Sequence, residues 1–371
     1  MTKAVTVNHS VEQGIREFLT FLLDTGKVKG VFTLKKLNKK GDVAYSLITR
    51  SDELTDAVPF FPLMPVNAGK LVSRFTMNGS PSEPVAVVLK PCELRAFIEL
   101  VKLEQGSLDN MVFISATCGG VFPLNMVHEG TIEKNLSPYW TAIKKEEIPE
   151  NIRPVCKACT EFIPYNADLV LNLVGNKNLD SQCDIVIETK KGEEITTDTD
   201  IKKKYSQKEY KKENLDTFKE RREAEKKKII EDIDTKLTGM DGLIEIFGKC
   251  IGCHGCSKAC PICYCKLCEF ESSDSEYGPS NYEAELKRRG AVRVPPNTLY
   301  YHLGRLSHIA ISCVGCGSCE DACPVDIPVS IIFKKIGESI QNMFEYTPGK
   351  SIEEKIPLTT FKEKELTEIE E

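Results

Sequence analysis

The pattern of hydrophobic and polar positions changes character along the chain. Across residues 11–186, helical stretches alternate with short apolar, β-branched runs, which is typical of an α/β domain. The runs that we expect to be strands are residues 30–34, 85–89, 111–115 and 168–171. A helical apolar period then covers residues 91–105. The pattern therefore predicts a sheet with covering helices and places Lys90, Pro91 and Cys92 at a strand-to-helix turn.

A second segment, residues 197–240, is dominated by Lys, Glu, Asp and Arg. Such a mixed run predicts a solvated helix that joins two domains and carries i,i+4 ion pairs. The alternative is a docking arm for an acidic partner. Beyond this segment, residues 297–311 and 329–344 have helical apolar periods. The end of the chain, residues 346–371, becomes acidic after Glu363 and is expected to be peripheral or bound to a partner.

Two cysteine runs with the same spacing, C-x2-C-x2-C-x3-C-P, lie between residues 250 and 324. In two-cluster ferredoxins this spacing gives three thiolates to one [4Fe–4S] cluster and the fourth to its neighbour. Zinc sites usually pair two shorter C-x2–4-C units, so zinc is the weaker alternative. We expect two clusters and an electron-transfer role. The expected ligands are set I (Cys250, Cys253, Cys256 and Cys323) and set II (Cys260, Cys313, Cys316 and Cys319).

Four more cysteines lie in the α/β segment. Two of them follow expected strands, and the other two form a C-x2-C pair, which is a common half-site for zinc or a cluster. We expect them to hold a third cluster near the edge of the sheet, and we call them set III: Cys92, Cys118, Cys156 and Cys159. Two alternatives remain. In one, Cys92 and Cys118 are small buried hydrophobic residues and only the C-x2-C pair binds a metal or cluster. In the other, Cys263, Cys265 and Cys268 supply ligands instead.

Composition narrows the class of protein. A chain of 371 residues permits two domains with full cores, and its sixteen cysteines suit metal ligands in an anaerobe better than disulfides. The first residues lack the apolar core of a signal peptide, so we expect a cytoplasmic protein. No apolar run approaches the roughly 18 to 20 residues that cross a membrane. A net charge of −6 disfavours nucleic acid as a partner.

Four segments carry a resemblance to a known family: residues 12–31, with Gly14 in the first helical turn, residues 90–96, residues 156–175 and residues 250–328. The first three are similar to the first helix and strand, the Pro-Cys turn and the cysteine pair of the beta subunits of coenzyme F420-reducing hydrogenase and F420-linked formate dehydrogenase. The last resembles the dicluster part of formate dehydrogenase beta chains, and also electron-transfer subunits of anaerobic sulfite reductase.

This resemblance implies an FAD beside the α/β domain, with coenzyme F420 as a substrate. It implies a phosphate contact at Gly14, where a helix N-terminus offers free N–H groups. Further candidates for contacts with flavin phosphates or an acidic cofactor tail are Arg16, Lys70, Lys90 and Arg95. The single tryptophan, Trp140, either stacks on a flavin ring or simply packs.

A flavin exchanges both single electrons and hydride. The implied function is therefore an electron-transfer subunit between a catalytic formate dehydrogenase or hydrogenase chain and F420 or a heterodisulfide reductase-type partner. One alternative is a flavin-free relay subunit of an anaerobic reductase such as sulfite reductase. Another is a stand-alone, ferredoxin-dependent reductase. No Walker-type loop, Ser/His/Asp arrangement or complete G-x-G-x-x-G is present, which disfavours those enzyme classes.

The expected fold class is α/β with a mostly helical iron–sulfur module. The expected parts are a flavin-binding α/β domain with a mixed sheet (1–196), a charged helical linker (197–240), a ferredoxin-like domain with two [4Fe–4S] clusters (241–345) and a C-terminal tail (346–371).

Overall fold

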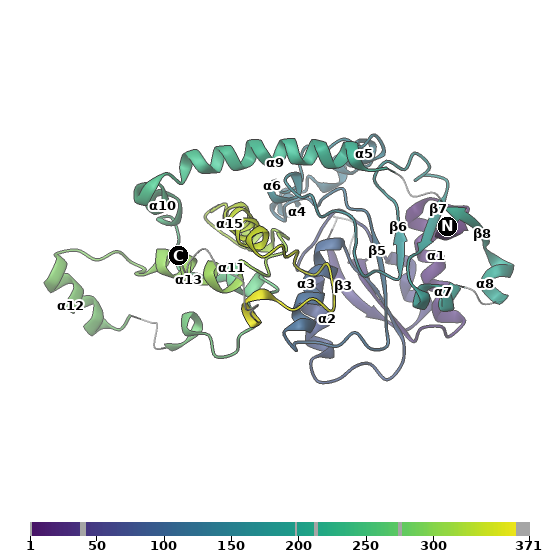
Figure 1. The fold of residues 1–371 in the computed structure, drawn as a ribbon, viewed down its shortest axis with the longest axis horizontal. Coiled ribbons are helices and arrows are strands. Elements are labelled where there is room, and N and C mark those ends of the chain that lie inside the picture. Colours follow the sequence, from purple (N-terminus) through teal and green to yellow (C-terminus); the bar gives the residue numbers. More distant parts are fainter. Residues whose placement is uncertain (1, 38–41, 197–198, 211–213, 274–276, 361–371) are drawn as a thin grey trace, which may run out of the picture.

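The computed structural model describes residues 2–37, 42–196, 199–210, 214–273 and 277–360. An α/β domain and a helical ferredoxin module lie side by side, and the long helix α9, Asp216–Lys236, passes over both (Figure 1). Among the described residues, no helix is long and apolar enough to cross a membrane.

The α/β domain is built on one mixed sheet of eight strands in the order β3-β2-β4-β5-β6-β7-β1-β8. Strands β2, β4, β5 and β6 are parallel neighbours. Strand β7 is antiparallel to both β6 and β1, so β1 runs in the same direction as the parallel strands. The carboxyl ends of five strands therefore lie at one edge of the sheet. The bounds are β1 Thr2–Val7, β2 Gly30–Lys36, β3 Val43–Ile48, β4 Val85–Val88, β5 Met111–Ala116, β6 Leu169–Leu171, β7 Cys183–Ile187 and β8 Ser206–Tyr210.

The helices of the α/β domain connect these strands and cover them. Their bounds are α1 Val11–Asp24, α2 Ala68–Thr76, α3 Pro91–Lys102, α4 Asn125–His128, α5 Ile132–Lys144, α6 Pro154–Lys157, α7 Lys190–Thr196 and α8 Thr199–Lys204, with the 3-10 helix η1 at Ser51–Asp56. The strand-to-helix turn expected at Lys90 is confirmed, because β4 ends just before it and α3 begins just after it. The mixed sheet is confirmed as well.

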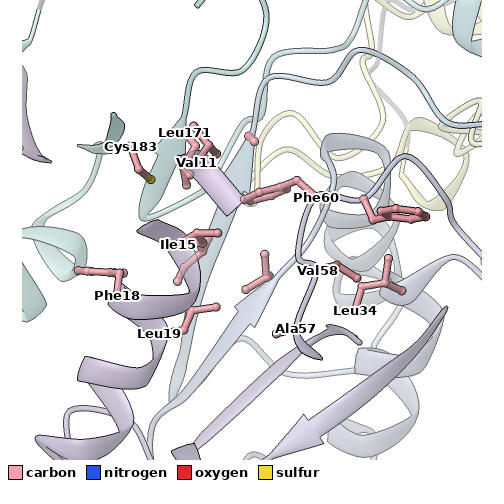
Figure 2. Close-up of a cluster of buried hydrophobic side chains, with 14 of the residues drawn as sticks. Val11, Ile15, Phe18, Leu19, Leu34, Ala57, Val58, Phe60, Leu171 and Cys183 are labelled. Atoms are coloured by element: carbon pink, nitrogen blue, oxygen red, sulfur yellow. The ribbon is translucent and has the colours of Figure 1, made fainter. Parts of the chain in front are cut away.

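Helix α1 packs closely on the sheet. Val11, Ile15, Phe18 and Leu19 point from one face of the helix into a common apolar core, close to Cys183 of β7 (Figure 2). A Cβ atom at Gly14 would lie only 2.5 Å from the Cβ atom of Cys183. Gly14 therefore allows the helix to approach the strand.

The ferredoxin module is mostly helical, as expected. Its elements are α10 Gly239–Phe247, α11 Gly255–Ala259, η2 Glu269–Glu271, α12 Pro279–Arg289, α13 Thr298–Ile309, α14 Ser318–Asp321 and α15 Val329–Met343, followed by η4 Pro357–Thr359. Helices α13 and α15 confirm the two apolar periods. Their buried faces share one core with Phe247 of α10 and Ile233 of α9.

The charged segment combines an expected helix with an unexpected strand. Helix α9 confirms the solvated helix, since only Phe218, Arg222 and Ile233 of its residues are buried. Strand β8, however, lies beyond residue 196 and pairs with β1 as the last strand of the sheet. Its side chains are polar and mostly exposed. An edge strand tolerates such residues, so its composition resembles that of a linker.

The described part of the C-terminal tail is not peripheral, which corrects the expectation for residues 346–360. Pro348 accepts a hydrogen bond from Arg95 Nε at 2.7 Å, and the Gly349 amide donates to Glu99 Oε1 at 2.8 Å. Both partners belong to α3, and Ile356 is buried. The tail thus returns from the ferredoxin module to the α/β domain, while its acidic end, residues 361–371, lies outside the described residues.

Candidate iron–sulfur and flavin sites

The two cysteine runs of the ferredoxin module fold against each other through the short helices α11 and α14. Tight turns separate the first two cysteines of each run, and Gly252 and Gly315 have φ angles of 68° and 66° there. Such angles favour glycine. The Gly252 amide donates to Cys250 Sγ at 3.4 Å, and amide hydrogen bonds of this kind tune cluster potentials.

The structure brings together the four thiols of set II, although Cys260 belongs to the other run. Cys260, Cys313, Cys316 and Cys319 line one cavity. Burial raises the pKa of Cys313 to about 12, and the next contribution comes from the nearby Cys260. In set I, burial raises the pKa of Cys250, and its neighbours Cys253 and Cys323 contribute. The fourth cysteine of each run therefore lies beside the other run.

Set III is assembled from separate elements at the carboxyl edge of the sheet. Cys92 is the second residue of α3, Cys118 follows β5, and Cys156 and Cys159 lie in and after α6. Burial raises the pKa of Cys156 to about 12, and Cys118 and Cys159 add to the effect. Burial also raises the pKa of Cys92, where the largest charge contribution comes from Cys316 of set II. Set III is thus close to set II.

Three buried cations surround set III. The exposed fractions of Lys90, Arg153 and Arg222 are 6%, 2% and 1%. Arg222 donates to the carbonyl oxygens of Cys118 and Cys159, each at 3.1 Å. Within the described ranges, Lys90 Nζ has no hydrogen-bond partner. Unpaired buried cations are unfavourable. A [4Fe–4S] cluster on four thiolates is anionic, so these residues fit such a cluster.

Single metal ions are less well matched by the described side chains. In that part of the chain, no group of three or more His, Cys, Asp or Glu is arranged to hold a metal ion. A cubane is larger than one ion and holds its thiolates further apart. Three of the four cysteines outside these sets, Cys263, Cys265 and Cys268, line a separate cavity of about 450 Å³ between the two parts of the molecule. A hydrogen bond with Cys260 lowers the pKa of Cys263 to about 7. Cys263 therefore neighbours set II rather than set III.

Buried arginines are the main site residues that the sequence analysis missed. Arg305 of α13 is 3% exposed and donates from Nη1 to Cys256 Sγ of set I at 3.1 Å. Arg153 donates to the Cys316 carbonyl at 2.9 Å and pairs with Asp321. Arg222 stands in a run of charged residues, most of which are exposed. The one sequence signal for its burial is the i,i+4 spacing from Phe218, which places both residues on the same face of α9.

The five candidate flavin residues are spread over the α/β domain. Gly14 contacts β7, and Arg16 Nη1 donates to the Thr55 carbonyl at 2.8 Å. Lys70 Nζ donates to the carbonyls of Lys258 and Cys260, both at 2.7 Å. Lys90 lies near Cys118, and Arg95 binds the tail. The structure therefore does not gather these five residues into one pocket.

A second cavity, which we call the α1 cavity, opens beside the start of helix α1. It has a volume of about 230 Å³. Its lining includes aromatic side chains and charges of both signs, and Lys144 pairs with Asp180. The aromatic and charged residues are Phe60, Phe61, Trp140, Lys36, Lys144, Glu12 and Asp180. Ser10 caps α1 by accepting a hydrogen bond from the Gln13 amide at 3.4 Å. Because α1 follows β1, the cavity lies at the same edge of the sheet as set III.

The fold and the three thiol sets define an iron–sulfur electron-transfer protein with an α/β domain. Residues 82–213 match the C-terminal part of the family described as "Coenzyme F420 hydrogenase/dehydrogenase, beta subunit", and residues 246–327 match the "4Fe-4S dicluster domain". The F420-dependent formate dehydrogenase subunit beta of Methanocaldococcus jannaschii is 31% identical over 360 residues, which cover 89% of each chain. The chain belongs to this family of coenzyme F420 hydrogenase and dehydrogenase beta subunits and is therefore an oxidoreductase subunit.

Two further matches are weaker. The F420-dependent formate dehydrogenase 1 subunit beta of Methanococcus maripaludis is 27% identical over 365 residues, covering 89% of this chain and 88% of the relative. A chain in the structure of the F420-reducing [NiFe] hydrogenase complex from Methanosarcina barkeri is 15% identical, with a TM-score of 0.45. That match covers 65% of this chain and 94% of the other.

Proposed function

We propose that this subunit passes electrons between a catalytic formate dehydrogenase or hydrogenase chain and coenzyme F420, using three [4Fe–4S] clusters and one FAD. Family membership supports the iron–sulfur electron-transfer role, and the names of the relatives support F420. A heterodisulfide reductase-type partner stays a prediction from the sequence. The observation that carries the proposal is the succession of set I, set II and set III across the molecule.

Sets I and II are linked because each takes a ligand from the other cysteine run. Sets II and III are linked across the boundary between the two parts of the molecule, where Cys92 lies close to Cys316. Arg153 stands at this boundary. It donates to the Cys316 carbonyl, and its charge also acts on Cys156 and Cys92. These contacts support a continuous series of sites leading from the ferredoxin module into the α/β domain.

We place the FAD in the α1 cavity. Open α/β sheets commonly bind ligands beyond the carboxyl ends of their strands. Lys36 and the N-terminus of α1 suit a phosphate, while Trp140 suits a flat ring. Tyr139 precedes Trp140 in α5, and its Oη donates to the Gly120 carbonyl at 2.9 Å, close in sequence to Cys118. Helix α5 would thus separate the flavin from set III. When bound, FAD supplies the exchange between single electrons and hydride.

The direct test is the composition of the protein purified without oxygen. Iron, acid-labile sulfide and released flavin would be measured per chain on one sample. We expect about twelve irons and one FAD. About eight irons without flavin would instead support the alternative of a flavin-free relay with two clusters.

A substitution tests the position of the flavin. Trp140→Ala should reduce the flavin content and leave the iron content unchanged, because Trp140 lines the α1 cavity and lies outside all three thiol sets. Tyr300→Ala is the matched control, since Tyr300 is an exposed aromatic residue of α13 in the ferredoxin module. Full flavin content in Trp140→Ala would rule out the α1 cavity as we describe it.

A further inference from the structure

Arg222 is a buried cation on a helix whose other charged residues mostly face solvent. It is 1% exposed, and its guanidinium lies against the rings of Phe162 and Phe218, 5.1 and 4.5 Å from their centroids. The neighbouring Arg221 instead donates to the Glu146 carbonyl near the surface. Helix α9 therefore places the positive charge of Arg222 inside the α/β domain.

The hydrogen bonds of Arg222 hold that charge beside set III. Nη1 donates to the Cys159 carbonyl and Nη2 to the Cys118 carbonyl, each at 3.1 Å. In the part of the chain that the structure describes, no carboxylate forms an ion pair with Arg222. Arg153 differs, because its charge is balanced by Asp321. Among the described side chains, Arg222 therefore has no carboxylate that balances its charge.

We infer that Arg222 is a positioning residue that raises the reduction potential of the cluster in set III. This inference rests on the proposed third cluster. Reduction adds a negative charge to a cluster, and a fixed nearby cation stabilises the reduced form more than the oxidised form. Lys90, also buried and near Cys118, contributes in the same direction. The cluster of set III thus retains electrons more readily than it would without these residues.

The experiment is a redox titration of the anaerobically purified full chain, followed by electron paramagnetic resonance, with iron measured on each sample. Arg222→Gln keeps hydrogen-bonding capacity but removes the charge. At a fixed potential we expect about a tenfold lower ratio of reduced to oxidised cluster for one of the three clusters, equivalent to a shift of about 59 mV. Arg222→Lys, which keeps the charge, should titrate like the unaltered protein.

Two other variants identify which cluster responds. Arg221→Gln is the neighbouring control on α9 and should leave all titrations unchanged. Arg305→Gln should shift a different cluster, because Arg305 donates directly to Cys256 of set I. If Arg222→Gln and Arg305→Gln shift the same cluster, the inference fails.

The outcomes separate this inference from the proposed function. About eight irons in the unaltered protein would remove the third cluster, and the inference with it. About twelve irons with an unchanged titration in Arg222→Gln would overturn the inference alone. If Arg222→Gln loses iron, the comparison moves to Arg222→Lys. Full iron content and an unchanged cluster potential in Arg222→Lys would support the inference. Lost iron or a lowered cluster potential in Arg222→Lys would contradict it.

Discussion

The thiols of the ferredoxin module and those of the α/β domain reach their positions in different ways. Sets I and II come from two local runs, in which short helices and glycine turns bring cysteines together within a few residues. Set III comes from the ends of β4 and β5 and from α6, so its members meet only after the sheet has formed. Spacing alone can identify the first kind of site, whereas the second kind depends on the topology of the fold.

The charges around the two kinds of site also differ. In the ferredoxin module, Arg305 donates directly to the sulfur of a candidate ligand, Cys256. Around set III, Arg222 donates to the carbonyls of two candidate ligands, Cys118 and Cys159, from a helix that lies far along the chain. Part of the positive charge around set III therefore comes from α9, a segment that contains none of its cysteines.

The largest expected effect is the loss of a whole cluster. Cys260→Ala should lower the iron content from about twelve to about eight per chain, because Cys260 lies in the cavity of set II. Cys92→Ala should remove about four irons from set III by the same reasoning. Iron and sulfide analysis of the two single variants and the double variant would show whether the sites fill independently.

Cys265→Ser is the control for these variants, since Cys265 is exposed and lies outside the three sets. A loss of iron in Cys265→Ser would instead indicate that Cys265 is a cluster ligand. Full iron content in Cys260→Ala would contradict the exchange of ligands between the two runs.

The next effect concerns the boundary between sets II and III. Arg153→Met leaves Asp321 buried without its partner, which typically destabilises by about 3 to 5 kcal/mol. We expect a clearly lower midpoint of thermal unfolding under anaerobic conditions. Arg50→Met is the control, because Arg50 forms an exposed pair with Asp52, and such pairs contribute about 1 kcal/mol or less. Equal midpoints for the two variants would mean that Arg153 does not stabilise the boundary.

The smallest effect concerns the link between α9 and the ferredoxin module. Burial alone would raise the pKa of Glu338, but Lys334 and Lys226 lower it below its usual value. A lowered carboxyl pKa stabilises the fold at neutral pH, and this contribution is lost as the pH falls through the folded-state value. Glu338→Gln should therefore cost about 1 kcal/mol at pH 7. The difference from the unaltered protein should narrow below about pH 4.5.

Thermal unfolding between pH 7 and pH 4 would measure this difference. Glu225→Gln is the control, since among the described residues Glu225 pairs with Lys228 of its own helix, at 3.3 Å, and with no other cation. A difference for Glu338→Gln that stays constant across this range would contradict the role of its charge.

Much of the fold follows from short-range patterns. The parallel strands, α9, α13 and α15 were predictable because each has a clear apolar or charged period. Strand β8 was not, because its polar side chains suit an edge strand and a linker equally well. At the candidate sites, spacing predicted sets I and II. The hydrogen-bond partners of Lys70 and Arg95 depend on how the two parts of the molecule pack against each other, and no local sequence pattern predicts that packing.

The ferredoxin module is attached to the α/β domain at both of its ends, through α9 before it and through the tail after it. One attachment would act as a hinge, whereas two prevent the module from swinging. Gly349, with a φ angle of 69°, lies directly against the backbone of Arg95 and leaves no room for a side chain. Electron tunnelling becomes steeply slower with distance. The tail carries no cysteine. By holding sets II and III at a constant distance, it would nevertheless fix the rate of electron transfer between them.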